Sequence, residues 1–373
     1  MKIGILNSLY PPYHRGGAEI VASIMVSDLA KLGHEVFVIS TCPKESYQES
    51  NVYYLKSKYY QLNQIPTPLR IFWHIHNLFD CRQKNRVKRI INKEKPGLII
   101  THNLMGLGLQ LPKLFKAKKI KHFHVIHDIQ LLHPSGLMFY NREKIINSLL
   151  AKKYQMITSQ LMSSPAVVIC PSHWLLKLHE QKGFFPKSVK KTIPNPIKNN
   201  YQTNNKERNR TEFLSVGLVS KHKGTDVLIK AFNKLPKLNL TIVGDGDYLT
   251  EAKKMANKNI TFLGRLDNTE VQELMLQTSA LIVPSLCYEN SPTIIYEAVA
   301  SKLPVIGSNL AGVAELINHY GGLLFKPGSA NDLVEKIEYF LDNYEAITSR
   351  FPKEPLPPDD YAKQIIDLSQ NTG

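Results

Sequence analysis

The sequence of 373 residues contains little cysteine and no long hydrophobic run. Its four cysteines (Cys42, Cys81, Cys170 and Cys287) are too scattered for a disulfide framework or a metal site, which indicates a reducing compartment. No segment reaches the roughly 18–20 apolar residues of a membrane-spanning helix, and the N-terminus lacks the hydrophobic core of a signal peptide. We therefore expect a cytoplasmic protein, with peripheral attachment to the cytosolic face of a membrane as the alternative.

Acidic residues are scarce in the first half of the chain. Residues 1–200 hold 29 Lys and Arg against 10 Asp and Glu, whereas residues 201–373 hold 18 against 21, for a formal net charge of +16. This asymmetry predicts different partners for the two halves, and anionic lipid, nucleic acid or a phosphorylated acceptor would each suit the basic half. No known nucleic-acid-binding module appears, so we expect no nucleic acid partner.

The chain has an ordinary content of hydrophobic residues, 43% against 21% charged, which excludes collagen-like, coiled-coil and wholly disordered classes. Short apolar segments alternate with helical patterns in both halves. Predicted strands lie at residues 2–6, 35–40, 98–101, 122–126 and 166–170, and again at 212–216, 238–243, 260–263, 280–283 and 304–307. This alternation predicts the α/β class, with two doubly wound, Rossmann-like domains built on parallel sheets.

A break in the alternation separates the two domains. The prolines of Ile193-Pro194-Asn195-Pro196 and the polar residues 199–211 are typical of a linker. We predict an N-terminal domain at 1–195, a C-terminal domain at 196–350, and a tail at 351–373 whose helix, capped by Asp359, packs back toward the N-terminal domain. Ligands of doubly wound domains bind beyond the carboxyl ends of the strands, so two such domains facing each other form a cleft.

The loop after the first predicted strand, Arg15-Gly16-Gly17-Ala18-Glu19, leads into a helix. Paired glycines at a helix N-terminus suit a diphosphate or a sugar-phosphate acceptor, because backbone N–H groups can approach the anion. A tight turn that needs glycine is the simpler explanation of this loop taken alone. The Gly-x-Gly-x-x-Gly spacing is absent, which argues against a nicotinamide dinucleotide site.

Two further loops place polar side chains at predicted strand ends. His127-Asp128 follows the strand at 122–126, and Lys223 precedes Gly224 in the loop after the strand at 212–216. Side chains at these positions point into the predicted cleft, where the lysine ammonium can neutralise a leaving diphosphate. A loop histidine bonded to backbone and a solvated lysine are the structural alternatives, which spacing alone does not dismiss.

The segment from Tyr288 to Ala298 is the most specific motif. Its apolar run begins a helix with Pro292 in the first turn and Ser291 or Thr293 near the N-cap, and the first N–H groups of such a helix attract anions. Glu289 precedes the helix and Glu297 lies within it. Two carboxylates beside an anion site can bind the hydroxyls of a sugar and of a ribose on either side of a diphosphate. The simpler alternative is that one glutamate only offsets the helix dipole at the N-terminus and that the other is an ordinary surface residue.

These motifs together resemble one enzyme family. The chain is similar, over nearly its whole length, to the retaining glycosyltransferases of the GT-B fold in family 4, the glycosyltransferase group 1 type. The resemblance rests on Gly16-Gly17-Ala18-Glu19, His127-Asp128, Val216 to Gly224, Val243-Gly244-Asp245-Gly246, Phe262-Leu263-Gly264-Arg265, Pro284-Ser285, the residues 304–307 and 311–315, and Glu289 with Glu297. The two glutamates stand eight positions apart, as in the family's Glu-x7-Glu signature.

The resemblance implies an enzyme that moves a sugar, with retention of configuration, from a nucleotide diphosphate sugar of the UDP or GDP type to an acceptor hydroxyl. A hexosyl group and a lipid-linked or polysaccharide-precursor acceptor are implied. The implied catalytic residues are His127, Lys223 and Glu289. The implied donor-binding residues are Gly16, Gly17, Lys223, Gly264, Arg265, Glu289, Asn290, Ser291, Pro292, Thr293 and Glu297. Because the lysine neutralises the departing diphosphate, the resemblance implies neither a metal nor another cofactor.

Three positions depart from the family pattern. Leu218 stands where the family usually has an arginine that partners the lysine, and Lys302 and Ala311 stand where it usually has glycine. The missing arginine leaves open a catalytically weakened, sugar-nucleotide-binding partner subunit. A GT-B sugar-nucleotide epimerase is the nearest alternative enzyme, although the spacing of the glutamates favours transfer.

The basic half is expected to face the acceptor. The residues assigned to the acceptor or membrane side are Arg15, Asp128, Arg82, Arg86 and Arg89. The last three lie in a basic segment that follows the apolar and aromatic residues 69–79. Basic residues beside aromatics suit an anionic membrane surface, while an ordinary helix whose apolar residues face the core is the competing interpretation.

Overall fold

The computed structural model describes residues 1–13, 16–197, 208–354, 356 and 360–372. The chain forms two compact units. Unit 1 comprises Met1–Leu137, Lys144–Pro196 and Pro358–Gly373, and unit 2 comprises Met138–Glu143 and Ile197–Pro357. The main chain thus passes into unit 2 after Pro196, one residue beyond the predicted boundary, and residues 138–143 also belong to unit 2.

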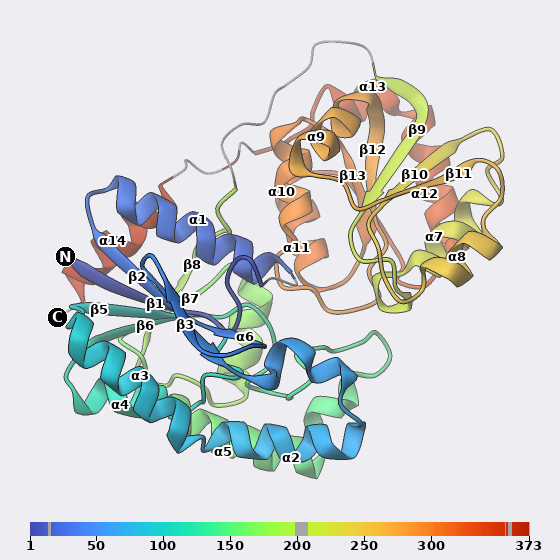
Figure 1. Ribbon diagram of the computed structural model, residues 1–373. Coiled ribbons are helices and arrows are strands. Elements are labelled where there is room, and N and C mark those ends of the chain that lie inside the picture. Colours follow the sequence, from blue (N-terminus) through green and yellow to red (C-terminus); the bar gives the residue numbers. More distant parts are fainter. Residues whose placement is uncertain (14–15, 198–207, 355, 357–359, 373) are drawn as a thin grey trace. The chain divides into compact units, whose positions relative to one another are not determined.

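Unit 1 is built on an eight-stranded sheet in the order β3-β4-β2-β1-β5-β6-β7-β8 (Figure 1). Its strands are β1 (Lys2–Leu6), β2 (Glu35–Cys42), β3 (Tyr47–Glu49), β4 (Val52–Lys56), β5 (Leu98–Thr101), β6 (Lys121–Val125), β7 (Val167–Cys170) and β8 (Val189–Thr192). All pairs are parallel except β3 with β4. The strand order reverses at β1, which lies between β2 and β5, and ligands of such sheets bind at this point.

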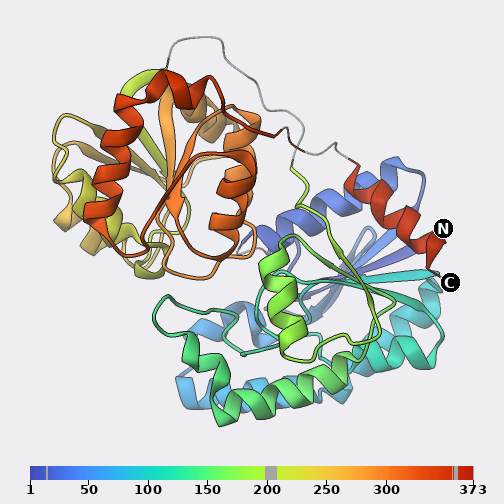
Figure 2. The same cartoon turned by 180° about the vertical axis from the view of Figure 1, so that it is seen from behind.

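Helices cover the sheet of unit 1. They are α1 (Gly17–Lys31), η1 (Lys58–Gln64), α2 (Thr67–Leu78), α3 (Cys81–Glu94), α4 (Leu111–Ala117), η2 (Glu143–Asn147), α5 (Leu149–Met162), α6 (His173–Gln181) and α14 (Tyr361–Asn371). Figures 1 and 2 show α1 and α14 on one side of the sheet and α3 and α4 on the other. The parallel sheet is therefore covered on both faces, as its unbroken apolar strands require.

The last helix, α14, belongs to unit 1 although it ends the chain. Tyr361 and Ile365 pack in the same core cluster as Met25 and Leu29 of α1. The Lys121 ammonium donates to the carbonyl of Ser369 at 2.7 Å. Asp360 stands at the N-cap position of this helix, and Asp359, the predicted cap, lies outside the described residues.

Unit 2 is built on a six-stranded parallel sheet in the order β11-β10-β9-β12-β13-β14. Its strands are β9 (Asn209–Val216), β10 (Asn239–Val243), β11 (Ile260–Gly264), β12 (Thr278–Val283), β13 (Val305–Ser308) and β14 (Leu323–Phe325). Its helices are η3 (Lys221–Lys223), α7 (Thr225–Phe232), α8 (Leu249–Met255), α9 (Asn268–Gln277), α10 (Thr293–Ala300), α11 (Ala311–Tyr320), α12 (Ala330–Asp342) and α13 (Tyr344–Thr348). Phe213 and Leu214, neighbours on β9, belong to separate core clusters because strand side chains alternate between faces.

The predicted α/β class with doubly wound parallel sheets is confirmed, and three local predictions are wrong. The strands β3, β4, β8 and β14 were not predicted; β3 and β14 have only three residues each, and all four lie at or next to a sheet edge. Residues 209–211, assigned to the linker by their polarity, begin β9, because Asn209 pairs with Thr278 of β12. Pro292 is the N-cap of α10 rather than a residue of its first turn, although Ser291 and Thr293 flank the N-cap as predicted.

Among the described residues, no helix combines the length and the apolar character needed to cross a bilayer.

Candidate functional site

In unit 2, a lysine and a glutamate from separate loops meet at the carboxyl ends of the strands. Lys223 ends η3, after β9, and Glu289 lies between β12 and α10. The Lys223 Nζ and Glu289 Oε2 atoms lie 2.7 Å apart, and the side chains are 31% and 14% exposed. The Ser285 hydroxyl donates to the other oxygen of Glu289, Oε1. The carboxylate is thereby held from two sides.

Both members of this pair are charged at neutral pH. Burial alone would raise the pKa of Glu289, but the Lys223 ammonium and the Ser285 hydroxyl outweigh it and hold that pKa below 4.5. Burial likewise opposes the charged form of Lys223, yet Glu289 keeps the lysine pKa above 10.5. The result is a half-buried cation at a strand end, of the kind that stabilises a developing phosphate charge.

Two glycines permit the close packing of these loops. A Cβ atom on Gly224, next to Lys223, would lie 1.9 Å from the carbonyl oxygen of Pro284. A Cβ atom on Gly312 of α11 would lie 1.5 Å from the carbonyl oxygen of Asn290. The Gly312 N–H also donates to the carbonyl of Glu289 at 3.0 Å. Any larger residue at either position would push the Lys223 or the Glu289 loop out of place.

The helix α10 follows the Glu289 loop directly. Its first N–H groups have no carbonyl of their own helix to bind, and its N-terminus attracts anions. The Ser291 hydroxyl lies 2.6 Å from that of Tyr296, so its side chain holds the loop to the helix. Glu297 is half-buried on α10. Asn290, Ser291, Pro292 and Thr293 thus form the entry to this helix, as the sequence predicts.

Residues 138–143 of unit 2 support the same loop. The Tyr288 N–H donates to Met138 O and the Tyr140 N–H donates to Leu286 O, each at 2.9 Å, so Phe139 bridges Cys287 in an antiparallel pair. The Tyr288 hydroxyl donates to Glu143 at 2.7 Å. Sequence reasoning missed this support, because nothing in the residues 138–143 signals a pairing so far along the chain.

The position of the missing arginine is open to solvent. Leu218 is 45% exposed and follows Gly217 at the end of β9. Of the neighbouring cationic groups, Lys221 has its ammonium over the ring of Tyr248, 5.2 Å from the centroid, and His222 and Arg265 add little positive charge. Burial and the nearby Lys223 lower the pKa of His222, and Arg265, 78% exposed, has its Nε 3.9 Å from Asp245 Oδ2. Arg265 follows Gly264 at the end of β11, beside the carboxyl end of β10.

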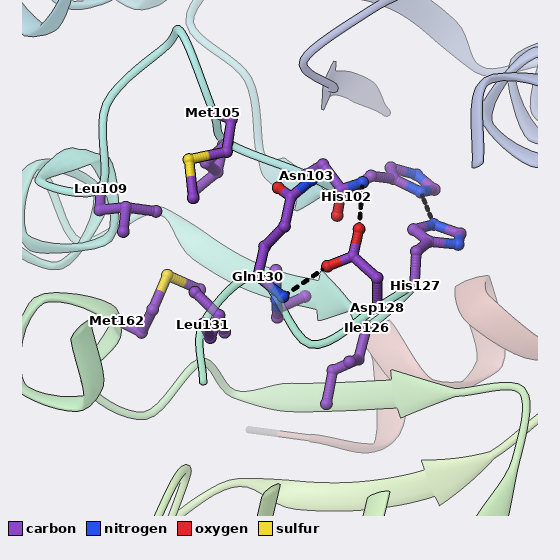
Figure 3. Close-up of a pocket in the computed structure, with 12 residues that line it drawn as sticks. His102, Asn103, Met105, Leu109, Ile126, His127, Asp128, Gln130, Leu131 and Met162 are labelled. Atoms are coloured by element: carbon purple, nitrogen blue, oxygen red, sulfur yellow. Dashed lines mark hydrogen bonds between the residues drawn. The ribbon is translucent and has the colours of Figure 1, made fainter. Parts of the chain in front are cut away.

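In unit 1, His127 and Asp128 follow β6, and two residues after β5 contact them (Figure 3). His102 Nδ1 lies 2.7 Å from His127 Nε2, and the two rings stack with centroids 5.0 Å apart. The Asn103 amide donates to Asp128 Oδ2 at 3.2 Å, and the Gln130 N–H donates to Asp128 Oδ1 at 2.7 Å. These residues border a small cavity of about 20 Å³, roughly the size of one water molecule.

Burial sets the charge state of this cluster. It lowers the pKa of His127 to about 4, and burial together with His127 also lowers that of His102, so both imidazoles are neutral at neutral pH. Burial raises the pKa of Asp128 to about 7. The Nε2 atom of His102 is buried and has no hydrogen-bond partner among the described residues.

Sequence reasoning missed His102 and Asn103, although a signal was present. They directly follow the predicted strand at 98–101, as His127 and Asp128 follow the next one. Since β5 and β6 are parallel neighbours, with Thr101 opposite His124, residues just past both ends must meet. Applying the strand-end rule to every strand would have found the pair.

The glycine loop of unit 1 is partly committed to its own helix. The Gly16 N–H donates to Glu19 Oε2 at 2.9 Å, and α1 begins at Gly17. Arg15, assigned to the acceptor side, lies outside the described residues. Arg82, Arg86 and Arg89 are exposed on α3, and the described contacts do not join them to the His127 cluster.

The backbone conformation at the two remaining departures from the family pattern, Lys302 and Ala311, explains why glycine is usual there. Their φ angles are +53° and +48°, in the left-handed region that glycine adopts without strain. Lys302 follows the C-cap of α10, where its N–H donates to the carbonyl of Val299 at 3.0 Å. The turn therefore keeps its shape with lysine, at an energetic cost.

Replacing this residue, Lys302→Gly, is expected to stabilise unit 2. The left-handed strain is about 1–2 kcal/mol, and the greater freedom of glycine in the unfolded chain offsets about 0.4–1 kcal/mol. A net gain near 1 kcal/mol would raise the unfolding temperature by about 2–4 °C in calorimetry. The control Lys253→Gly, in the interior of α8, should lower it. A lower unfolding temperature in both variants would contradict the prediction that Lys302 is strained.

Comparisons with known proteins match almost the whole chain. The family model for glycosyl transferases group 1 matches residues 197–351, and that for glycosyltransferase family 4 matches residues 15–200. A 42.6 kDa protein of the cps region of Klebsiella pneumoniae is 25% identical over 100% of this chain and 98% of its own length. TuaC of Bacillus subtilis, a putative teichuronic acid biosynthesis glycosyltransferase, is 25% identical over 94% of this chain and 95% of its own.

Solved structures share the fold at low identity. Sucrose-phosphate synthase from Thermosynechococcus elongatus matches with a TM-score of 0.74 and 18% identity, over 99% of this chain and 98% of that one. Anabaena HepE in complex with UDP-glucose matches with a TM-score of 0.68 and 18% identity, over 100% and 98%. Since the two family models together span residues 15–351, the chain belongs to the group 1, family 4 glycosyltransferases, and its doubly wound units are those of the GT-B fold.

Proposed function

We propose that this glycosyltransferase transfers a hexosyl group, with retention of configuration, from a nucleoside diphosphate sugar to an acceptor hydroxyl. The observation that carries the proposal is the Lys223–Glu289 pair at the carboxyl ends of the strands of unit 2. A fixed cation beside a helix N-terminus suits a diphosphate leaving group. Structures of HepE hold UDP or UDP-glucose, which supports a nucleotide sugar of the UDP type as the first donor to test.

In the proposed reaction, the bond between the anomeric carbon and the diphosphate oxygen breaks, and the acceptor oxygen bonds to the same face of that carbon. Lys223 stabilises the charge that develops on the diphosphate. Glu289 holds the lysine in place, and the glutamate carboxylate accepts a hydrogen bond from a sugar hydroxyl. Glu297 on α10 binds the ribose hydroxyls, and His127 contacts the transferred sugar. The departing diphosphate takes the acceptor proton, so catalysis consists of orientation and charge stabilisation.

No metal is needed in this scheme, because Lys223 and the N-terminus of α10 offset the diphosphate charge. Among the described residues, no three His, Cys, Asp or Glu side chains gather as metal ligands would. The acceptor we propose is a lipid-linked or polysaccharide precursor. The teichuronic acid role in the name of TuaC and the cps-region origin of the Klebsiella relative support that choice.

The first experiment is thermal unfolding with UDP, GDP, ADP and their hexose conjugates, with magnesium or with EDTA. A ligand at 100 times its Kd should add about 2.7 kcal/mol of stability. We expect one nucleotide base to be selected and the shift to persist in EDTA. No shift with any nucleotide would refute the donor site, and a shift that needs magnesium would refute metal independence. Proton NMR of the product then gives the anomeric configuration.

A second function is favoured by Leu218, which replaces a charge with an apolar, exposed side chain. The chain would then be a nucleotide-sugar-binding partner subunit with weak activity of its own. Donor binding without turnover, tested with extracts that supply acceptors, would identify it. Formation of a new free nucleotide sugar without transfer would point to an epimerase.

A further inference from the structure

Two helices of unit 1 expose large apolar side chains of the kind that soluble proteins normally bury. On α2, Leu69, Phe72 and Ile75 are 56%, 69% and 54% exposed. On α5, Leu149, Leu150 and Met156 are 79%, 80% and 58% exposed. These six residues are called the α2–α5 patch. Apolar side chains gathered in this way mark an interaction surface, whereas single ones need no explanation.

The orientation of α2 is fixed by its inner face. The side-chain oxygen of Asn77, Oδ1, accepts a hydrogen bond from the N–H of Gly106 at 2.7 Å, and the ring of Trp73 stacks on that of Tyr59 with centroids 6.0 Å apart. The apolar residues, spaced three apart, therefore face outward. The interpretation in which the apolar residues of this segment face the core is thus wrong for these three.

The helix α5 likewise turns polar side chains toward the interior of unit 1. Gln155, which is buried, donates its amide to the carbonyls of Leu132 and Ile146 at 3.0 and 2.7 Å. The buried Thr158 hydroxyl donates to the carbonyl of Leu131 at 2.7 Å. Gln155 and Thr158 thus lie on the inner face of α5, together with the buried Leu161 and Met162, while Leu149, Leu150 and Met156 lie outside. A helix with this arrangement has its apolar surface available for a partner.

The two helices are joined inside the unit. The Tyr154 hydroxyl of α5 donates to the carbonyl of Gln130, whose side-chain amide donates to the Tyr59 hydroxyl, and Tyr59 stacks on Trp73 of α2. Figures 1 and 2 both show α2 and α5 running along the same side of unit 1, below the sheet. The two helices that carry the exposed apolar residues therefore lie on one side of the unit.

The charge around the patch has one sign. Lys144, Lys152 and Lys153 are exposed beside the leucines, and Arg82, Arg86 and Arg89 are exposed on α3, which follows α2. Residues 50–79 and 144–179 contain no Asp or Glu. Lysines among leucines, with no acidic residue, are typical of an interfacial helix on an anionic bilayer.

We propose that the α2–α5 patch docks unit 1 on an anionic lipid bilayer, with its apolar side chains in the interface and its lysines against the headgroups. A second copy fits less well, because a two-fold interface would place the lysine pairs of the two copies on the same contact surface. The proposal rests on the proposed function only in that a lipid-linked acceptor would lie in that bilayer. Binding itself requires no catalysis.

The test is flotation of the full chain with vesicles of phosphatidylcholine alone, or of equal parts phosphatidylcholine and phosphatidylglycerol. We expect binding to the anionic vesicles only, weakened as salt is raised. The double variants Leu149→Glu/Leu150→Glu and Lys152→Gln/Lys153→Gln should each weaken binding by about tenfold or more. The matched control Lys253→Gln/Lys254→Gln, an exposed lysine pair on α8 of unit 2, should bind as the unchanged chain does.

Donor-induced thermal shifts and light scattering, measured on the same samples, separate the outcomes. A retained nucleotide shift shows that a patch variant is folded, so its loss of vesicle binding belongs to the patch. Equal binding to neutral vesicles, no vesicle binding, or equal loss in the control pair would each overturn the proposal. A dimer that Leu149→Glu/Leu150→Glu converts to a monomer would also overturn it, in favour of a second copy.

Discussion

Replacing Lys223 with methionine is expected to lower kcat by 10²–10³-fold, equivalent to about 2.7–4 kcal/mol of barrier. The ammonium lies at the carboxyl end of the sheet, 2.7 Å from Glu289, and Leu218 stands in its loop where the family usually has an arginine. Methionine has a similar length but carries no charge. The release of nucleoside diphosphate under saturating donor measures the loss.

Stability must be separated from chemistry in this variant. Removing the lysine leaves Glu289, 14% exposed, without its cation, which should destabilise unit 2 by roughly 1–3 kcal/mol. The double variant Lys223→Met/Glu289→Gln removes both charges and should recover much of that stability while remaining inactive. The control Lys221→Met, in the same short helix, should keep activity within about twofold. Activity near that of the unchanged enzyme in Lys223→Met would contradict the assignment.

Introducing an arginine, Leu218→Arg, is expected to raise kcat by about tenfold or more, since 1.4 kcal/mol of added charge stabilisation corresponds to tenfold. Leu218 is 45% exposed, so the larger side chain enters without displacing a packed core residue. The pair of cations typical of the family would then be restored. Donor affinity should rise or stay equal, because the guanidinium also faces the ground-state diphosphate.

The matched control is Leu32→Arg, an equally exposed leucine at the end of α1, which should leave kcat unchanged. An increase in both variants would indicate a general effect of charge. No increase in Leu218→Arg, with an active starting enzyme, would mean that another group already offsets the diphosphate. A rise from undetectable turnover would identify the chain as a partner subunit weakened at this one position.

The predictable parts of the fold are those set by local periodicity. The strands at 2–6 and 98–101 were placed at their observed bounds, and the core strands of unit 2 within a few residues, because buried parallel strands are continuous apolar runs. The edge strand β8, Val189–Thr192, contains two lysines and has no such signal. Its strand conformation comes from pairing with β7.

The candidate site was predictable where its function requires particular residue types in a fixed order along the chain. Lys223 was named from its strand-end position and Glu289 from its place before a helix N-terminus, both with the family pattern, and the two are in contact. His102 was not named, because only the neighbouring position of β5 and β6 brings it to His127. The support that residues 138–143 give to Tyr288 is likewise a contact between distant parts of the chain.

The sequence by itself determined the α/β class, the order of the motifs, the charge asymmetry between the halves and the absence of the second cation. These are properties of composition and local spacing. Only the tertiary structure decided that Lys223 pairs with Glu289, that Lys302 bears left-handed strain, and that the six apolar residues of the α2–α5 patch face outward. The physical reason is that an amphipathic pattern fixes which residues share a face, while packing against the rest of the unit decides which way that face turns.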